Sequence, residues 1–339
     1  MPHHIDVLSI GDVVTDAFIK LRPTEAEINK DPVDKHPLLC MTYGTKIPFE
    51  EAIVIEGVGN SANAAVSFAR LGLKSSLYGN VGDDDNGRDI LVALKKNGVQ
   101  TQFMQVNKGK VSNYHYVLWY KDDRTILIKH EEYKYKFPNI DKSDTPKWLY
   151  LSSFAEHGAY LIDEVLDYMD DHAEVKLAFQ PGTFMMRLGF DKLKRLYKNT
   201  ELFVVNVEEA QMMTGMAGER NIRKMMEYIH ERGPKIVCIT DGPKGSYASD
   251  GTTVWSMRNY PDPAEPFERT GAGDAYTSTF VAGLITTGNL QEAMKWGPIN
   301  SMSVVQKVGA QEGLLTRPAL ERFLAAAPKD YEPKEYKHG

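Results

Sequence analysis

Cysteine is scarce in this chain of 339 residues: only Cys40 and Cys238 occur, and they do not form a CxxC pair. A disulfide framework or a zinc site built from thiolates is therefore not expected, and such cysteine usage is typical of a reducing compartment. The sequence also lacks an uninterrupted apolar run of about 18 residues, the shortest that spans a membrane. Its first residues show no basic stretch followed by a long apolar core, so no secretion signal is expected. These absences predict a cytoplasmic protein that does not enter a membrane.

An excess of basic charge is missing as well. The chain carries 40 lysine and arginine residues against 46 aspartate and glutamate residues, which gives a net charge of −6 and a pI near 5.9. Binding to nucleic acid needs a basic face that displaces counterions, so a nucleic-acid partner is not expected. Hydrophobic residues at 42% and charged residues at 25% are ordinary for a folded globular protein, and the length suits one large α/β domain or two smaller units.

Short apolar runs alternate with helical patterns along most of the chain. Runs that predict strands occupy residues 5–10, 75–81, 149–151, 176–179, 202–207 and 236–240. Patterns that predict helices occupy residues 61–71, 87–97, 159–172, 190–197 and 222–232. Strands separated by helices of this length are joined by right-handed crossovers, so the predicted fold class is α/β with a mostly parallel central sheet.

Two segments depart from this rhythm. Residues 19–50 are polar and punctuated by prolines, and the stretch is too long for a simple connection. Residues 113–137 alternate aromatic and β-branched side chains around Asp122-Asp123, a pattern typical of a hairpin with one wet face. We expect both segments to build a small β lid, and the charged tail after Ala327 to be frayed.

The sharpest local feature is the turn Gly271-Ala272-Gly273-Asp274, which runs directly into an apolar helical pattern. Glycines let backbone N–H groups turn inward, and the start of a helix adds its positive dipole end, so this turn predicts an anion hole suited to phosphate. Asp274 would repel a bound anion, but its carboxylate can take the proton from a hydroxyl that attacks a phosphoryl group. The alternative is that Asp274 is a helix N-cap.

A second glycine-rich stretch allows a different function. Residues 57–62, GVGNSA, fit GxGxxA between a predicted strand and a predicted helix, with acidic residues at 83–85. This is the fingerprint of a dinucleotide site and predicts an NAD-binding oxidoreductase. That alternative gives no role to the turn at 271–274 or to the lid segments.

Residues 59–72, GNSANAAVSFARLG, and residues 268–274, ERTGAGD, resemble the two signature motifs of the ribokinase (PfkB) family of carbohydrate and nucleoside kinases. The first motif continues through residues 79–87. The likeness extends over most of residues 5–325, with the intervening motifs in the family's order.

The resemblance implies a three-layer, ribokinase-like α/β domain with a mostly parallel central sheet and a small β lid. It implies one kinase domain over residues 1–327, with lid segments at about 17–52 and 108–137, followed by a charged C-terminal tail at 328–339. In relatives the lid strands often pair between subunits, so a homodimer through the lid is expected.

The implied activity is transfer of phosphate from ATP, with Mg²⁺, to a hydroxyl of a small sugar. Asp274 would be the general base, and Gly271, Ala272 and Gly273 would form the anion hole. A nucleoside such as adenosine, inosine or cytidine is the alternative substrate, because aromatic lid residues could stack on a base. The same residues could instead pack the lid or a dimer interface. They are Tyr43, Phe49, Tyr114, Tyr116 and Trp119.

The sugar site follows from motifs that match the family. Asp16, at the end of the segment GDVVTD, would accept hydrogen bonds from sugar hydroxyls, and Gly59 and Asn63 would close the other side of the sugar. Without the resemblance, the preferred explanations are a helix cap for Asp16 and an amide on a helix surface for Asn63.

The ATP site follows in the same way. Asn206-Val207-Glu208-Glu209 resembles the family's N-x-x-E element, so Asn206 would lie at the ATP site and Glu209 would hold Mg²⁺ through water. Thr240, Gly242 and Gly245 resemble the turn that lies along the ATP phosphates and ribose. The alternatives are two polar residues that open a helix and a β-turn between two strands.

Three positions depart from the family's pattern. Asn60 stands where ribokinases proper carry a lysine, and Ser152 stands where they carry a glutamate, so ribose itself is a weaker expectation than a small sugar in general. Glu268 replaces an aspartate that helps to hold a monovalent cation in several members, which leaves activation by K⁺ open.

Overall fold

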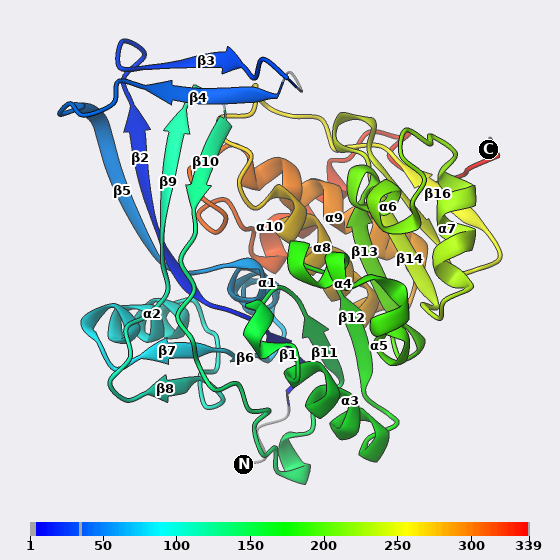
Figure 1. The fold of residues 1–339 in the computed structure, drawn as a ribbon. Helices are drawn as coiled ribbons and strands as arrows, with labels where there is room; N and C mark the ends of the chain where they lie inside the picture. Colours follow the sequence, from blue (N-terminus) through cyan, green and yellow to red (C-terminus); the bar gives the residue numbers. More distant parts are fainter. Residues whose placement is uncertain (1–4, 34–35, 122, 338–339) are drawn as a thin grey trace.

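The fold is built on a mixed central sheet in which most strands are parallel (Figure 1). The computed structural model describes residues 5–33, 36–121 and 123–337. In spatial order the strands are β6 (Ser75–Tyr78), β1 (Val7–Ile10), β11 (Trp148–Leu151), β12 (Lys176–Phe179), β13 (Leu202–Asn206), β14 (Ile236–Thr240), β15 (Ser246–Ser249), β16 (Val254–Met257) and β17 (Lys334–Glu335). The strands from β6 to β14 run parallel, and β15, β16 and β17 continue the sheet in antiparallel pairs.

The parallel strands are apolar because helices cover both faces of the sheet, and every residue of β1 and β11 is buried. One face packs against α3 (Leu161–Asp171), α4 (Thr183–Lys192), α5 (Lys194–Lys198), α6 (Val207–Thr214) and α7 (Ile222–His230). The other face packs against α1 (Asn60–Arg70), α8 (Ala272–Thr287), α9 (Leu290–Val304) and α10 (Arg317–Ala325). The predicted three-layer α/β fold is therefore confirmed. Among the described helices, none combines the length and apolarity that a bilayer crossing requires.

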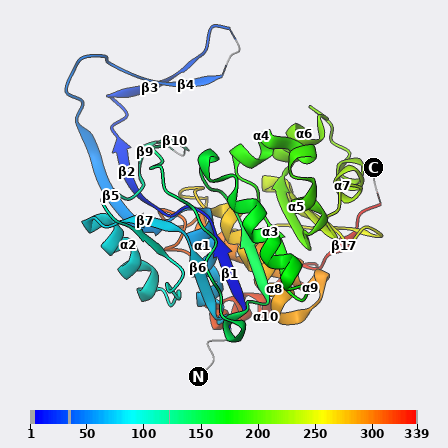
Figure 2. The ribbon, with the colours of Figure 1, turned by 60° about the horizontal axis from the view of Figure 1, so that its bottom comes forward.

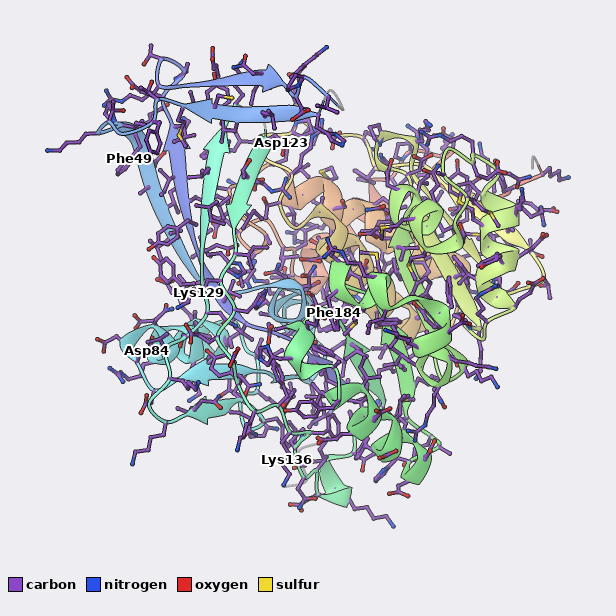
Figure 3. The ribbon with its side chains drawn as sticks, viewed as in Figure 1. Phe49, Asp84, Asp123, Lys129, Lys136 and Phe184 are labelled. Carbon is purple, nitrogen blue, oxygen red and sulfur yellow. The ribbon has the colours of Figure 1, made fainter. Side chains whose placement is uncertain are left out.

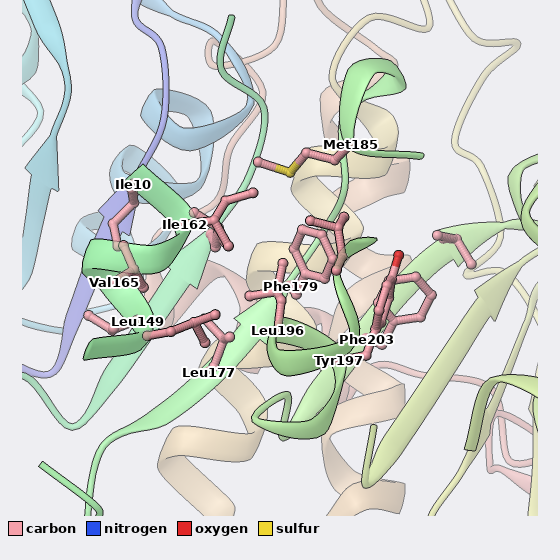
Figure 4. Packing of buried hydrophobic residues seen from close by; sticks show 14 of the residues in the cluster. Ile10, Leu149, Ile162, Val165, Leu177, Phe179, Met185, Leu196, Tyr197 and Phe203 are labelled. Atoms are coloured by element: carbon pink, nitrogen blue, oxygen red, sulfur yellow. The ribbon is translucent and has the colours of Figure 1, made fainter. Parts of the chain in front are cut away.

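Figure 4 shows part of the apolar core between the central sheet and the helices α3 to α7. Leu149 of β11, Leu177 and Phe179 of β12, Val165 of α3 and Leu196 of α5 belong to one buried cluster. Burying a side chain of this size contributes about 1.5–3 kcal/mol, so the cluster holds the strands firmly in register. The ends of these strands can consequently carry polar residues at fixed positions.

A small sheet stands apart from the central one. Its strands, in spatial order, are β10 (Asp123–Leu127), β9 (Tyr114–Tyr120), β2 (Val14–Leu21) and β5 (Phe49–Val58). A hairpin of β3 (Ala26–Lys30) and β4 (Pro37–Met41) extends from it and projects beyond the body of the molecule (Figure 2). The remaining elements are α2 (Asp85–Lys96), β7 (Asn80–Gly82), β8 (Gln105–Asn107) and the 3₁₀ turns η1 (Lys142–Asp144), η2 (Glu156–Gly158) and η3 (Gly242–Lys244).

The small sheet contains parts of the two segments, residues 19–50 and 113–137, that depart from the alternation of strand and helix patterns in the sequence. The parallel ladder between β2 and β9 joins residues 15–20, which lead into the first segment, to residues 114–119 of the second. The predicted hairpin is formed by β9 and β10, and of its predicted turn residues Asp122 lies outside the described part of the chain.

Two local predictions are wrong. The single helix expected at residues 190–197 is divided between α4 and α5, and Gly189 adopts a φ of 73° inside α4, a value that breaks the helical path. Over its described residues, 328–337, the tail is not frayed: β17 pairs with β16, and Tyr331 is 1% exposed. The tail is charged, but this one aromatic ring anchors it.

Tyr331 provides a test of the role of the tail. Its ring packs edge-on against Tyr260 at 5.1 Å between centroids, and its hydroxyl donates to the carbonyl oxygen of Lys295 at 2.7 Å. We expect Tyr331→Ala to lower the free energy of unfolding by about 3–5 kcal/mol, as large-to-small changes of buried aromatic residues do. Urea denaturation measures this loss. The exposed neighbour Glu335 is the control, because Glu335→Ala should change stability by less than about 0.5 kcal/mol; equal effects of the two changes would contradict an anchored tail.

Candidate active site

A cleft of about 410 Å³ opens where the parallel strands end. Its floor is lined by Asp12 after β1, Ser153 after β11, Gln180 after β12, Asn206 at the end of β13 and Thr240 at the end of β14. The carboxyl edge of a parallel sheet is where open α/β folds bind ligands, because side chains from successive strands converge there. The cleft is therefore the candidate site.

The glycine turn forms one wall of the cleft. Gly271 is the N-cap of α8 with a φ of 78°, and a Cβ atom at this residue would lie 2.3 Å from the Cβ of Ala310, so only glycine fits. Gly273 is exposed to the cleft, and a Cβ added to it would meet no atom within 4 Å. The first amides of a helix have no partners within the helix, and the turn presents its positive dipole end to open space. The amide of Ala272 makes a long hydrogen bond, 3.4 Å, to the carbonyl oxygen of Arg269.

The carboxylate of Asp274 is buried in the first turn of α8. It does not cap the helix: Oδ1 accepts from Nδ2 of Asn60 at 2.8 Å, and Oδ2 accepts from Nδ2 of Asn63 at 2.9 Å. Nε2 of Gln180 lies 3.4 Å from Oδ1. Burial raises the pKa of Asp274, and these amides, together with the charge of Arg124, act in the opposite direction. Neutral amides thus hold an ionisable carboxylate without cancelling its charge.

The predicted sugar residues lie in the same cleft as Asp274. Asp16 is on β2, so it is not a helix cap, and Asn63 is buried in α1, so it is not a surface amide. Gly59 has a φ of 109°, and a Cβ at this residue would lie 2.9 Å from the carbonyl oxygen of Asp12. Within the described residues, the buried Oδ1 of Asp16 has no hydrogen-bond partner, although Nδ1 of His115 lies 3.5 Å away. A buried acceptor without a donor is suited to a ligand hydroxyl.

Asn206 and Glu209 make the contacts of a helix opening. The Asn206 side chain accepts from the Glu209 amide at 2.8 Å, and Oε2 of Glu209 accepts from the Asn206 amide at 2.8 Å, which together form a capping box at the start of α6. Both residues nevertheless line the cleft, and burial raises the pKa of Glu209. Within the described residues, no group of three or more His, Cys, Asp or Glu side chains could hold a metal ion by itself.

The turn after β14 is only partly at the cleft. Thr240 lines it, whereas Gly242 and Gly245 lie in the connection to β15 and are not among the lining residues. This connection is the predicted turn between two strands. A Cβ at Gly245 would lie 2.2 Å from the carbonyl oxygen of Met257, and the φ of Gly245 is 98°, so the turn itself requires glycine here.

The small sheet adds residues that sequence reasoning missed. Successive residues of an extended chain point to opposite sides, so alternate positions of β10 and the segment after it face the cleft. They are Arg124, Ile126, Ile128 and His130. We call residues 124–130 the arm. Asp123 and Lys129, labelled in Figure 3, lie close to its two ends. The alternation in the sequence was the signal that could have identified them, but without the fold it did not show which side faces a cleft.

Charged contacts connect this arm to the rest of the site. Nε of Arg124 lies 3.9 Å from Oε1 of Glu268, and Nδ1 of His130 lies 3.3 Å from Oδ2 of Asp12. Glu268 is 2% exposed and accepts from the amides of Thr270 at 2.7 Å and Gly309 at 3.2 Å. Its carboxylate therefore stabilises the backbone of the residues that lead into the glycine turn.

The dinucleotide alternative does not fit the topology. The strand before the GVGNSA stretch is β5, which belongs to the small sheet and pairs antiparallel with β2. The dinucleotide fingerprint requires a strand of the parallel sheet that leads into the helix of a βαβ unit. The stretch at residues 57–62 lacks that context.

Known proteins resemble the chain over most of its length. The profile of the pfkB family of carbohydrate kinases matches residues 47–317. A 5-dehydro-2-deoxygluconokinase of Bacillus subtilis is 26% identical over 307 residues, which cover 82% of this chain and 90% of that protein. A ribokinase of the same organism is 26% identical over 275 residues, which cover 79% of this chain and 87% of that protein.

Solved structures share the fold. A ribokinase of Arabidopsis thaliana, complexed with ribose and ATP, superposes with a TM-score of 0.76 at 19% identity, over 95% of this chain and 99% of that one. A nucleoside kinase of Methanocaldococcus jannaschii superposes with a TM-score of 0.73 at 17% identity, over 94% of this chain and 98% of that one. These likenesses confirm the predicted architecture.

The raised pKa of Asp274 predicts a pH-dependent cost to stability. Because the folded state binds the proton more tightly than the unfolded state, the wild type should gain stability as the pH falls through the raised pKa towards the ordinary value of 3.8. Asp274→Asn cannot titrate, and its new NH₂ group must face the NH₂ donor of Asn60 or of Asn63, which adds a cost that does not depend on pH. We therefore expect the margin of stability of the wild type over Asp274→Asn to grow as the pH falls. Urea denaturation at several pH values measures the margin. Asp89→Asn, at an exposed position on α2, should show none; a margin for Asp274→Asn that did not change with pH would contradict the cause given.

Proposed function

Because the chain belongs to the pfkB family of carbohydrate kinases, phosphotransferases with a hydroxyl acceptor, we propose that it transfers the γ-phosphoryl group of ATP to a hydroxyl of a small sugar. The observation that carries this function is the buried carboxylate of Asp274 at the start of α8, in one cleft with Asp16 and Glu209. We also propose that residues 1–327 form a single kinase domain, with lid segments at about 17–52 and 108–137 that contribute to the small sheet.

Asp274 is the general base of this reaction. Its carboxylate takes the proton of the acceptor hydroxyl while the hydroxyl oxygen bonds to the γ-phosphorus and the bond to the bridging oxygen breaks, which releases ADP. The raised pKa of Asp274, caused by burial, makes the carboxylate a better proton acceptor. Asn60 and Asn63 hold its two oxygens in position.

The start of α8 stabilises the phosphoryl group during transfer. Gly271, Ala272 and Gly273 provide the anion hole, in which backbone donors and the helix dipole meet the negative charge of the equatorial oxygens. The open space beside Gly273 supports this role, because it leaves room for a phosphate oxygen against the backbone.

ATP lies across the ends of β13 and β14. Asn206 and Thr240 are paired neighbours in these strands and both line the cleft, and Gly242 and Gly245 shape the turn beyond them. Glu209 would hold Mg²⁺ through water. This role fits its surroundings, since burial and the charges of Glu208 and Asp274 raise the pKa of Glu209, so a cation would relieve an excess of negative charge. When bound, Mg²⁺ supplies charge neutralisation for the phosphates.

Asp16, Gly59 and Asn63 bind the sugar. The unpartnered Oδ1 of Asp16 accepts from a sugar hydroxyl, and the absence of a side chain at Gly59 lets the sugar approach the backbone.

The lining of the cleft favours a sugar over a nucleoside. Within the described residues, no Phe, Tyr or Trp side chain lines it, so no ring of that kind is placed to stack on a base. The aromatic residues that could have done so are engaged or exposed elsewhere: Tyr114 packs on Tyr116 at 5.2 Å, and Trp119 packs on Phe267 at 5.6 Å. Sugar kinases among the relatives, including 5-dehydro-2-deoxygluconokinases, support the same choice.

The free edge of the small sheet supports a homodimer. β5 is its edge strand, and Phe49 and Val54 on this strand are 50% and 49% exposed. An edge strand with exposed apolar side chains favours pairing with a second copy. Light scattering of the purified chain checks the assembly, and a monomeric mass at micromolar concentration would contradict it.

Asp274→Asn tests the base. We expect turnover to fall by about 10²–10⁴-fold, the usual contribution of a general base, while binding of ATP is retained. Release of ADP is measured with ribose, fructose, 2-keto-3-deoxygluconate, 5-dehydro-2-deoxygluconate, adenosine, inosine and cytidine, first for the wild type and then for the variant on the best acceptor. Asp89→Asn serves as the control of equal chemistry on the surface. Turnover of Asp274→Asn close to that of the wild type would contradict the role of Asp274 as the general base. A nucleoside as the best acceptor would contradict the proposed sugar substrate.

Gly273→Ala tests the anion hole separately from the fold. The added methyl group meets no protein atom, and alanine favours a helix over glycine by about 0.5–1 kcal/mol, so stability should be unchanged or raised. Turnover should nevertheless fall at least about tenfold, because the methyl group occupies the place of a phosphate oxygen. Thermal melting and ADP release are measured on the same preparation. Full activity in the stabilised variant would place the phosphate elsewhere.

A further inference from the structure

A buried glutamine lies behind the proposed base. Gln311 lies in the connection between α9 and α10 and is 7% exposed. Its Nε2 donates to the carbonyl oxygen of Gly57 at 2.8 Å and to Oδ1 of Asn63 at 3.0 Å. Gln311 is not among the residues that line the cleft, so its side chain can influence the reaction only through a neighbour.

The direction of these hydrogen bonds is fixed from the backbone outward. The carbonyl of Gly57 can only accept, so the amide nitrogen of Gln311 must face it. The same nitrogen then presents its second hydrogen to Asn63, whose side-chain oxygen must turn towards Gln311. The NH₂ group of Asn63 is left to face Oδ2 of Asp274, to which it donates at 2.9 Å.

This order matters because an asparagine side chain has nearly the same shape in its two amide orientations. Turned over, Asn63 would present its oxygen to the carboxylate of Asp274, and two acceptors would face each other at hydrogen-bond distance. Asn63 is 5% exposed, so water cannot easily correct the wrong orientation. The donor to Asp274 therefore depends on the partner on its other side.

The connection that carries Gln311 is itself held. Nη1 of Arg70, at the end of α1, donates to the carbonyl oxygens of Gln311 at 2.7 Å and Leu314 at 2.9 Å. Arg70 and Asn63 belong to the same helix. Arg70 therefore fixes the backbone at Gln311 relative to the side chain of Asn63, which Gln311 orients.

We propose that Gln311 is a positioning residue for phosphoryl transfer: it fixes the amide orientation of Asn63 and thereby keeps a donor on the carboxylate of Asp274. This inference rests on the proposed role of Asp274 as the base. Gln311 touches neither substrate. Its effect is to favour the ionised form of the base and to hold Oδ2 in place.

Two substitutions at Gln311 separate orientation from packing. Gln311→Met keeps the length but donates nothing, so Asn63 is free to adopt either orientation. Gln311→Glu offers an acceptor to Asn63 and attracts its NH₂ group, which turns the asparagine oxygen towards Asp274. We expect kcat to fall less than about tenfold for Met and by about 10- to 100-fold for Glu, with KM for ATP unchanged. The acidic limb of the pH profile of kcat/KM should move to higher pH for Glu.

The control for added charge is Gln102→Glu, the same change at an exposed position, which should leave both the profile and kcat unchanged. A double variant separates the two routes by which the introduced carboxylate could act. In the Asn63→Leu background there is no amide to turn, so Gln311→Glu should no longer shift the titration of Asp274. A shift of undiminished size in that background would show a direct charge effect and overturn the positioning role, as would equal losses for Met and Glu with no change of the pH profile.

A readout without turnover keeps this test independent of the proposed function. Isotope-edited NMR of the aspartate carboxyl carbons follows the titration of Asp274, whose resonance is identified by its loss in Asp274→Asn. The expected upward shift of that titration in Gln311→Glu, and its absence in the double variant, can be seen whether or not a sugar is phosphorylated. An enzyme that transfers phosphate to none of the acceptors would refute the proposed function alone, whereas an unshifted titration in Gln311→Glu would refute the positioning role alone.

Discussion

A carboxylate that must stay ionisable inside a protein wall is the constraint on which this structure depends. Burial works against the charge of Asp274, and hydrogen bonds that favour the ionised form, together with the charge of Arg124, oppose it. The donors come from Asn60 and Asn63 on α1 and from Gln180 after β12. Helices α1 and α8 must therefore lie side by side on one face of the sheet, and the apolar cluster between them keeps that spacing.

The two sheets divide the work between them. The central sheet supplies a rigid floor, because its strands are covered on both faces and end in polar residues at one edge. The small sheet supplies a roof of alternating residues, two of them isoleucines and two of them basic or ionisable. A polar floor and a partly apolar roof suit an acceptor with hydroxyl groups on one side and carbon–hydrogen groups on the other. A sugar, the acceptor proposed above, has that character.

A feature could be predicted from the sequence when the residues that determine it lie close together in the chain. The strands, the helix after Gly271 and the paired lid segments were predictable, since period, glycine and proline act within a few residues. The charge count could not reveal that Tyr331 anchors the tail, because one buried ring outweighs several exposed charges. Asn206 and Glu209 carry the same letters whether they cap a helix or hold an ion, and in the structure they cap one. Gln180 and Gln311 gave no signal at all, because their partners lie about a hundred or more residues away in the chain.

The edge strand β17 follows all other described strands of the central sheet in the sequence, and this order has a consequence for biosynthesis. Until Lys334 and Glu335 have left the ribosome, β16 remains an unpaired border whose backbone groups are open to other chains. The ring of Tyr331 likewise reaches its place beside Tyr260 only after every helix has been translated. The nascent protein can therefore assemble the floor of the cleft before this border of the sheet is paired.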